Sequence, residues 1–298
     1  MIDGVPIDCR TSSILGVLNN SIYEHISGSI CYMDIFLDFN RKKRSIRIEK
    51  SNPIFSLAKF GFKIESRIFR KQDLPDAYED IIQSCGIVIQ HSYSTLLRRM
   101  RMIKVNLPVD IPHLVYSQQI RKVNDNLIFN TTDLRFRVMS WNHFFLNDDD
   151  EIVIYLIQKK PDVEQKKEFF IHSAREAMEV YLSTVSSQLI EDILSHMSSD
   201  IILEKNYDSA AVWNRNVWKL YITREWYYRC LQVFFPVCQK SESLVRLSSG
   251  YKTISDAIVE NVINNKSYTL TDYIERFGEL LHNEYKIVEK IHEQIKDH

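Results

Sequence analysis

A cysteine near the beginning of the chain stands where a helix would favour its thiolate. Cys9 lies in residues 7–18, where apolar side chains recur at the three- and four-residue spacing of one helix face. Asp8 or Thr11 can cap the first turn, because a short side-chain oxygen accepts from its free N–H groups. The positive end of the helix dipole and the charge of Arg10 then stabilise a thiolate. The pattern predicts a nucleophilic cysteine with backbone donors beside it that can hold an oxyanion.

The base that such a thiol needs is expected on a strand in the middle of the chain. Residues 135–158 contain two apolar runs around an acidic turn, which predicts a β-hairpin with His143 on its first strand. A neutral imidazole there can accept the proton of Cys9, so His143 is the predicted base. His91 and His113 are the alternatives, because either can end a strand near the cysteine helix.

A third residue that would orient the imidazole is not identified by the sequence. An Asn or Asp usually has this role. The nearest polar residues here are Glu151 and Gln158, and hairpin pairing places neither beside His143. The simpler alternative is that neither group is catalytic. In that case Cys9 is a small half-buried residue, and His143 is a core histidine bonded to the backbone.

The composition fits a soluble globular protein and excludes several classes of function. The chain has 298 residues, enough for two domains, and is 45% hydrophobic and 26% charged. Its formal net charge of -1 gives no global attraction to nucleic acid. With seven glycines, it lacks both the Gly-x-Gly-x-x-Gly and the Gly-x-x-x-x-Gly-Lys pattern, which argues against nucleotide enzymes of those types.

The cysteine pattern indicates a reducing compartment. The five cysteines are odd in number, widely spaced and without a Cys-x-x-Cys pair, which fits neither a disulfide framework nor a structural zinc site. The chain does not open with a basic segment and an apolar run, and it has no window of about 18 consecutive apolar residues. We therefore expect a cytoplasmic protein with no metal, no cofactor and no membrane span.

The predicted elements give an α+β fold in two parts. A helix stops at Gly86 before a short buried strand, 87–89, and the composition changes at 159–162. Beyond this boundary, periodic apolar residues predict four long helices with short links, which form an antiparallel bundle. The predicted domains are residues 1–160, with a mixed sheet and the cysteine helix, and residues 161–298, which are helical.

Two further features admit both a structural and a binding role. The basic run 41–44 fits a solvated turn between strands, although it can also meet a phosphate, such as that of a carrier-protein cofactor. A group of aromatic residues in the helical part fits either a hydrophobic core or the lining of an acyl pocket. They are Trp213, Trp218, Trp226, Tyr227 and Tyr228.

Three segments of the predicted N-terminal domain resemble the butirosin biosynthesis protein H family. They are Asp8–Leu15 at the helix start, Gly86–Ile89 after a helix, and His143–Leu146 before an acidic turn. The family usually has a histidine where this chain has Asp8, and a glycine-aromatic-acidic turn where it has residues 147–149. Members have a papain-like domain followed by a helical region, so the resemblance implies that architecture.

The resemblance also implies an acyl-transfer activity. Members move an acyl group from a carrier-protein thioester to an amine in a biosynthetic pathway, and Cys9 as nucleophile and His143 as base carry over. The implied partners are an acyl or peptidyl carrier protein, bearing its chain on phosphopantetheine, and a small-molecule amine acceptor. The alternatives are a papain-like cysteine peptidase or amidase, and a non-catalytic helical interaction protein.

Overall fold

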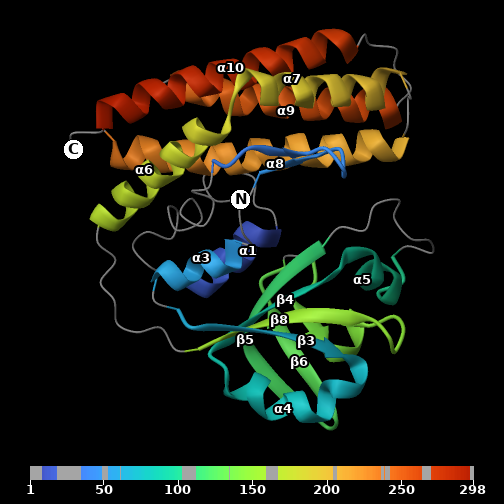
Figure 1. Cartoon of the computed structure of the whole chain (residues 1–298). Coiled ribbons are helices and arrows are strands. Elements are labelled where there is room, and N and C mark those ends of the chain that lie inside the picture. The colour runs from blue at the N-terminus through green and yellow to red at the C-terminus, as the bar shows by residue number, and fades with distance from the viewer. Residues whose placement is uncertain are drawn as a thin grey trace. The chain divides into compact units, whose positions relative to one another are not determined.

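The chain forms two compact units, each with helices and strands, in a computed structural model (Figure 1). The sheet unit comprises Met1–Cys31 and Asn52–Gln165, and the helical unit comprises Tyr32–Ser51 and Lys166–His298. The expected α+β class is confirmed. The residues that the structure describes are 9–18, 35–48, 53–60, 62–102, 112–133, 135–158, 167–203, 207–235, 238, 242–263 and 270–295.

The sheet unit contains a six-stranded sheet in the order β3-β8-β4-β5-β6-β7. Every pairing between these strands is antiparallel, so the expected mixed sheet is wrong for the described strands. The short connections from β5 to β6 and from β6 to β7 explain this, because parallel neighbours need long crossovers. The strands are β3 (Ile64–Arg70), β4 (Gly86–Ser92), β5 (Pro112–Val123), β6 (Asn126–Thr131), β7 (Val138–Ser140) and β8 (Glu151–Ile157).

The predicted hairpin over residues 135–158 does not form. β8 is hydrogen-bonded to β3 on one side and to β4 on the other, whereas β7 pairs with β6. The chain between β7 and β8 forms a 3₁₀ helix, η3 (Trp141–Phe144), so His143 lies in a helical turn rather than on a strand. The acidic turn is present, and the Asp150 carboxylate accepts from the backbone N–H of Asn147 at 2.9 Å.

One face of the sheet is covered by α4, α5 and η3, which share a hydrophobic core with it. The predicted helix before Gly86 and the buried strand after it are confirmed as α4 and β4. Alternate residues of the central strands, Ile87 and Ile89 in β4 and Ile154 in β8, are fully buried in this core. The helices of the unit are α1 (Cys9–Leu18), α3 (Pro53–Ser56), η1 (Leu57–Phe60), η2 (Lys71–Asp73), α4 (Leu74–Gln83), α5 (Tyr93–Arg99) and η3.

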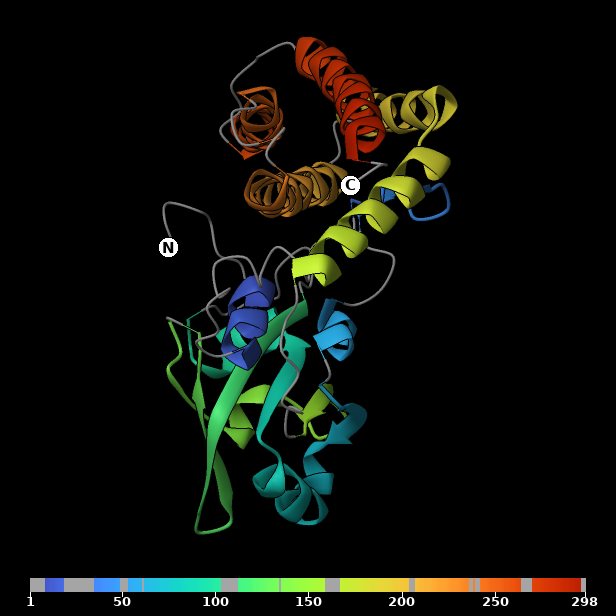
Figure 2. The same ribbon diagram turned by 90° about the vertical axis from the view of Figure 1, so that its left-hand side faces the viewer.

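The cysteine helix α1 lies close against β5 (Figure 2). Gly16 permits this approach, because a Cβ at that position would be 2.3 Å from Cδ1 of Tyr116 and 2.9 Å from Cγ2 of Thr132. The Ser12 hydroxyl also donates to the Thr132 carbonyl at 3.3 Å. These contacts hold the first turn of α1, which carries Cys9, beside β5 and the turn that follows β6.

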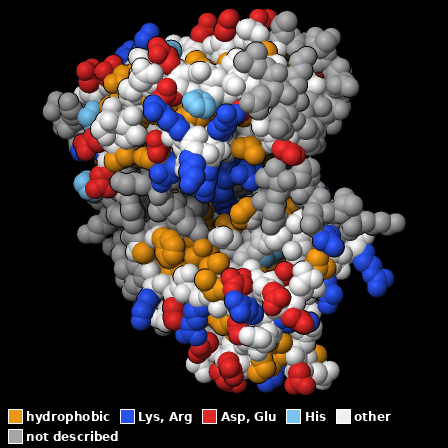
Figure 3. All heavy atoms as spheres, turned by 45° about the vertical axis from the view of Figure 1, so that its right-hand side comes forward, with side chains coloured by type: hydrophobic (Ala, Val, Ile, Leu, Met, Phe, Trp, Pro, Cys, Tyr) orange, Lys and Arg blue, Asp and Glu red, His pale blue; other side chains and the backbone are white. Residues whose placement is uncertain are grey.

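The surface of the sheet unit carries interspersed charges of both signs on the face shown in the lower part of Figure 3. Exposed ion pairs of this unit include Arg70 with Glu151 at 2.7 Å and Lys71 with Asp148 at 2.8 Å. Pairs of this kind add little stability, because water screens them. On that face, charges of the two signs are mixed, and no large patch of one sign is visible among the described residues.

The helical unit is built from five long or medium helices and a two-stranded hairpin within the described ranges. α8 packs against α9, and α10 packs against α6, α7 and α9. None of these helices is both long and apolar enough to cross a membrane. The elements are β1 (Asp38–Asn40), β2 (Ser45–Arg47), α6 (Lys167–Thr184), α7 (Ser187–Ser198), the π-helix η4 (Ser199–Leu203), α8 (Tyr207–Phe234), α9 (Glu242–Ile263) and α10 (Leu270–Ile295).

The expected number of helices is wrong by one. α7 is separate from α6 because the chain leaves helical geometry at Ser186, whose extended backbone begins a new N-terminus. Its hydroxyl accepts from the backbone N–H of Leu189 at 3.2 Å, which satisfies one free donor of the first turn. The four helices expected from the sequence do not include α7.

The hairpin β1–β2 groups with the helices, which the sequence division at residue 160 does not anticipate. Its basic run 41–44 is the turn between the two strands, as expected. Arg44 pairs with Asp200 at 2.6 Å, and the same carboxylate accepts from Nε1 of Trp213 at 2.8 Å. The Phe39 ring stacks on Trp213 with 6.2 Å between centroids. These contacts join segments more than 150 residues apart.

A buried carboxylate links four helices of the helical unit. Glu284 accepts from Nε of Arg224 at 2.7 Å and from the hydroxyls of Tyr181 and Tyr251 at 3.1 and 3.2 Å; Tyr228 also donates to it. Arg224 is fully buried. Because a buried charge is stable only when it is paired and hydrogen-bonded, this network fixes the relative positions of α6, α8, α9 and α10.

Replacing Arg224 with leucine should strongly destabilise the helical unit. The change leaves the Glu284 carboxylate buried without its counter-ion, and breaking a pair of this kind costs about 3–5 kcal/mol. Urea unfolding followed by tryptophan fluorescence measures this, since Trp213, Trp218 and Trp226 lie in this unit.

The matched control is Lys252→Leu, which removes an exposed ion pair with Asp256 on α9. It should change the free energy of unfolding by less than about 1 kcal/mol. Equal losses in the two variants would contradict a dominant role for the buried pair.

Candidate active site

Cys9 and His113 are brought together by the contact of α1 with β5. Cys9 is the first residue of α1 and is partly exposed, and His113 is the second residue of β5. Their side chains are hydrogen-bonded to each other. A sulfur at the first turn of a ten-residue helix thus has an imidazole as its direct partner.

Asp133 holds the other side of the same imidazole. Its Oδ2 lies 2.7 Å from Nε2 of His113, and both side chains are nearly buried, at 13% and 12% exposure. Its Oδ1 accepts from the backbone N–H groups of Arg135 at 2.8 Å and Phe136 at 3.1 Å. Since both carboxylate oxygens are engaged, Asp133 can hold the His113 ring in one orientation and leave Nδ1 for the sulfur.

The two chain segments that carry His113 and Asp133 are aligned by sheet pairing. β5 and β6 pair antiparallel, and the backbone N–H of Thr132 extends this pairing by donating to the Tyr116 carbonyl at 2.9 Å. Asp133 follows directly, at the start of the loop to β7. The Cys9–His113–Asp133 arrangement therefore depends on one helix, one strand, and the loop residue that directly follows the last hydrogen bond of Thr132 to β5.

The electrostatics of the site favour a protonated imidazole. Burial opposes the charged form of His113, but hydrogen bonds to Asp133 and Cys9 outweigh this and raise its pKa to about 9. Burial acts to raise the pKa of Asp133, yet its hydrogen bonds from His113 and the backbone lower it overall. The arrangement therefore places a protonated imidazole, with a carboxylate behind it, next to the Cys9 sulfur, and such surroundings can support a nucleophilic cysteine.

His91 packs against His113 but does not serve as a second base. The register of β4 and β5 places the two histidines opposite each other, with rings perpendicular and centroids 5.3 Å apart. Nδ1 of His91 donates to the Ser92 carbonyl at 2.9 Å. Burial, together with the positive charge of His113, lowers the pKa of His91 to about 3, so it stays neutral. Its role is to pack against the His113 ring.

His143, the predicted base, lies in η3 and makes its described hydrogen bond there. Its Nδ1 accepts from the backbone N–H of Ser140 at 3.1 Å, which is part of the capping of η3. Burial and the nearby Arg99 lower the pKa of His143. Among the described residues the hydrogen bond of Cys9 to a histidine goes to His113, the alternative base, and the structure does not pair Cys9 with His143.

Three other predicted features of the site are the residue that orients the histidine, the cap of the cysteine helix and the oxyanion donor. Glu151 pairs with Arg70 on the exposed edge of the sheet and so does not orient a histidine. Asp8, one predicted cap, lies outside the described residues, as does the side chain of Thr11. The backbone N–H of Cys9 lies in the first turn of α1, where N–H groups have no acceptor within the helix and can point toward an oxyanion.

The site residue that the sequence analysis missed is Asp133. A signal for it exists in the hairpin of β5 and β6, whose turn contains Asn124 in a left-handed conformation with φ 53°. Pairing the strands outward from that turn places residues just beyond β6 near the start of β5. A histidine at one end and an aspartate at the other would then have been recognised as neighbours.

Comparison with known proteins assigns no family to this arrangement. No family model, no curated protein and no solved structure matches the chain. The chemistry of the site must therefore be argued from its own residues.

Removing His113 should slow the alkylation of Cys9. In His113→Gln the thiolate loses its counter-ion, and the rate with iodoacetamide at pH 7 should fall by about tenfold or more, because the thiolate is the reacting form. Mass spectrometry of peptides after timed quenching measures it, and the exposed Cys85 in the same protein is the internal reference.

The matched control for this experiment is His143→Gln, which should leave the Cys9 rate unchanged. The proposed pairing is contradicted if His143→Gln slows Cys9 while His113→Gln does not.

The stability of the sheet unit should fall as the pH rises through 9. A histidine whose pKa increases from 6.5 to about 9 on folding stabilises the folded state fully below pH 6.5. That contribution disappears as His113 loses its proton near pH 9. Urea unfolding at pH 6 and pH 10 should show this decrease in the wild type and a smaller one in His113→Gln; parallel pH profiles would contradict it.

Proposed function

We propose that the protein is a cysteine-dependent acyltransferase with a papain-like catalytic unit. The observation that supports this most directly is the hydrogen-bonded series Cys9–His113–Asp133, with the cysteine at a helix N-terminus. The helix that carries the cysteine packs on an antiparallel sheet; the histidine comes from β5 of that sheet, and the aspartate from the loop that begins where the neighbouring strand β6 ends. That order of parts is the papain-like one.

In the first half of the proposed reaction, the acyl group moves from a thioester to the enzyme. The Cys9 thiolate attacks the thioester carbonyl, and the backbone N–H of Cys9 helps to stabilise the oxyanion of the tetrahedral intermediate. The carbon–sulfur bond to the donor thiol breaks, and protonated His113 supplies a proton to the departing sulfur. The product is a Cys9 acyl-enzyme and a free donor thiol, a nearly isoenergetic exchange of one thioester for another.

In the second half, an amine takes the acyl group. Its nitrogen attacks the acyl-enzyme carbonyl, and neutral His113 accepts a proton from that nitrogen. The bond from carbon to the Cys9 sulfur breaks, which regenerates the thiolate beside a protonated imidazole. Asp133 stabilises the imidazolium in both halves without taking the proton itself.

This proposal keeps the acyl-transfer chemistry expected from the sequence and changes the base. His113 replaces His143, because His113 is the histidine bonded to both Cys9 and a carboxylate. The donor is proposed to be a thioester carried on the phosphopantetheine of an acyl or peptidyl carrier protein, and the acceptor a small-molecule amine. The competing proposals are a cysteine peptidase or amidase with the same site, and a non-catalytic interaction protein.

Incubation with a butyryl thioester of N-acetylcysteamine should add one butyryl group to Cys9, detected by intact mass and peptide mapping. Cys9→Ala should give no adduct at this position. His113→Gln should slow adduct formation by about 10²–10⁴-fold, the usual contribution of a positioned acid–base residue. Adding an amine should release the adduct as an amide.

The outcomes separate the alternatives. Release of butyrate at the same rate with and without amine would favour hydrolysis over transfer. Cleavage of peptide substrates with no reaction of the thioester would favour a peptidase. If Cys9 and the exposed Cys85 acylate equally slowly, neither enzymatic proposal survives.

A further inference from the structure

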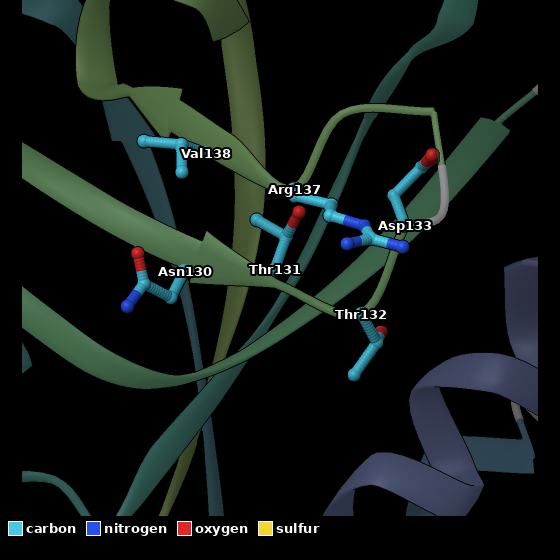
Figure 4. Close-up of a pocket in the computed structure, with 6 residues that line it drawn as sticks. All are labelled: Asn130, Thr131, Thr132, Asp133, Arg137 and Val138. Carbon is cyan, nitrogen blue, oxygen red and sulfur yellow. The ribbon is translucent and has the colours of Figure 1, made fainter.

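A pocket of about 570 Å³ lies directly beside the Cys9–His113–Asp133 arrangement. It is formed where β6 ends, in the loop to β7 and where β7 begins (Figure 4). Asp133 belongs both to the pocket wall and to the hydrogen-bonded series, so the pocket adjoins the catalytic groups. The residues that line it are Asn130, Thr131, Thr132, Asp133, Arg137 and Val138.

Most polar groups of this pocket already have partners. The Thr131 hydroxyl donates to the Phe136 carbonyl, and Nδ2 of Asn130 donates to Gln119 at 2.7 Å. Asp133 uses both oxygens, as described above. The guanidinium of Arg137 differs from these, because within the described part of the chain it makes no hydrogen bond or ion pair.

Arg137 is anchored at the pocket by its backbone, and its side chain is exposed to solvent. Its carbonyl accepts from the Thr131 N–H at 2.8 Å, which anchors the residue to β6. Figure 4 shows its guanidinium lying between the side chains of Thr131 and Asp133. The next residue, Val138, is 57% exposed and gives the pocket an apolar side.

The charge balance around the pocket favours an anion. The one carboxylate in its lining, Asp133, is already matched by protonated His113, whose pKa is raised to about 9. Arg137 therefore adds a positive charge that nothing in the pocket lining neutralises. A guanidinium in such a place binds carboxylate or phosphate oxygens through parallel hydrogen bonds.

We infer that this pocket binds an anionic oxygen group of the thioester substrate, with Arg137 as its specificity-determining residue. The anion is either a carboxylate at the end of the acyl chain or the phosphate of the donor arm, and both present the same chemistry to a guanidinium. This inference rests on the proposed acyl transfer for its substrate, whereas the anion site itself can be tested without turnover.

The first experiment compares acylation rates of Cys9 with matched anionic and neutral thioesters. One arm uses succinyl and butyryl thioesters of N-acetylcysteamine, and the other uses butyryl phosphopantetheine and butyryl pantetheine. The wild type should prefer the anionic member by about tenfold in one arm, which identifies the source of the anion, since a charged bidentate contact is worth that much or more.

Two arginine variants make the result specific. Arg137→Gln should reduce the ratio of anionic to neutral rates to about one, because glutamine keeps polarity and loses the charge and fork. The matched control, Arg121→Gln, removes an exposed arginine from β5 of the same sheet outside the pocket lining and should keep the wild-type ratio. A wild-type ratio near one in both arms, or equal loss in the two variants, overturns the inference.

The second experiment distinguishes this inference from the proposed reaction. Inorganic phosphate and succinate are titrated into Cys9→Ala protein, and binding is followed by NMR shifts of the backbone amides of residues 130–138. Saturable shifts that vanish in Cys9→Ala/Arg137→Gln support the anion site even if no thioester acylates Cys9, in which case only the acyl-transfer proposal fails. Absence of shifts, or unchanged shifts without Arg137, overturns the anion site.

Discussion

The hydrogen bonds on either side of the His113 ring are the interaction on which the candidate site depends. Asp133 on one side and Cys9 on the other together offset the cost of burying a charged imidazole and raise its pKa to about 9. The bond to Cys9 depends on the close packing of α1 on β5, where a Cβ at Gly16 would be 2.3 Å from Cδ1 of Tyr116. A residue without a side chain at this position of the first helix therefore allows the cysteine and the histidine to meet.

Two other histidines of the sheet unit, His91 and His143, do not take part in this pair. His91 stays neutral behind the His113 ring, because burial and the positive neighbour both disfavour its protonation. His143 is occupied in capping η3. In the helical unit, a buried Arg224–Glu284 pair links four helices, and three tyrosine hydroxyls donate to the Glu284 carboxylate. In both units, a buried charge faces an opposite charge to which it is hydrogen-bonded.

Local patterns in the sequence predict those parts of the fold that depend on local interactions. The cysteine helix, the buried strand after Gly86, the turn at 41–44 and four of the helices beyond residue 167 are visible as periodicity or turn chemistry. The order of strands is not, since β8 pairs with β3 and β4 rather than with its neighbour in sequence. The predicted position of His143 is affected by this, because the prediction put it on a strand of a hairpin that does not form.

The cysteine itself could be singled out because its signal is local, whereas its partners are 104 and 124 residues further along the chain. His113 was among the alternatives, but only strand register identifies Asp133 as its neighbour. The assignment of Tyr32–Ser51 to the helical unit has the same origin, since Arg44 and Phe39 find their partners on η4 and α8. Residues that interact across such separations leave no periodic trace in one sequence.

The most direct test of the Cys9–His113–Asp133 arrangement is an NMR titration of the His113 ring in the wild type and in Cys9→Ala. The wild-type imidazole should remain protonated until about pH 9, and removing the sulfur should lower that pKa, because one of its two supporting hydrogen bonds is lost. A His113 ring that titrates near pH 6.5, and does so equally in both proteins, would contradict the pairing.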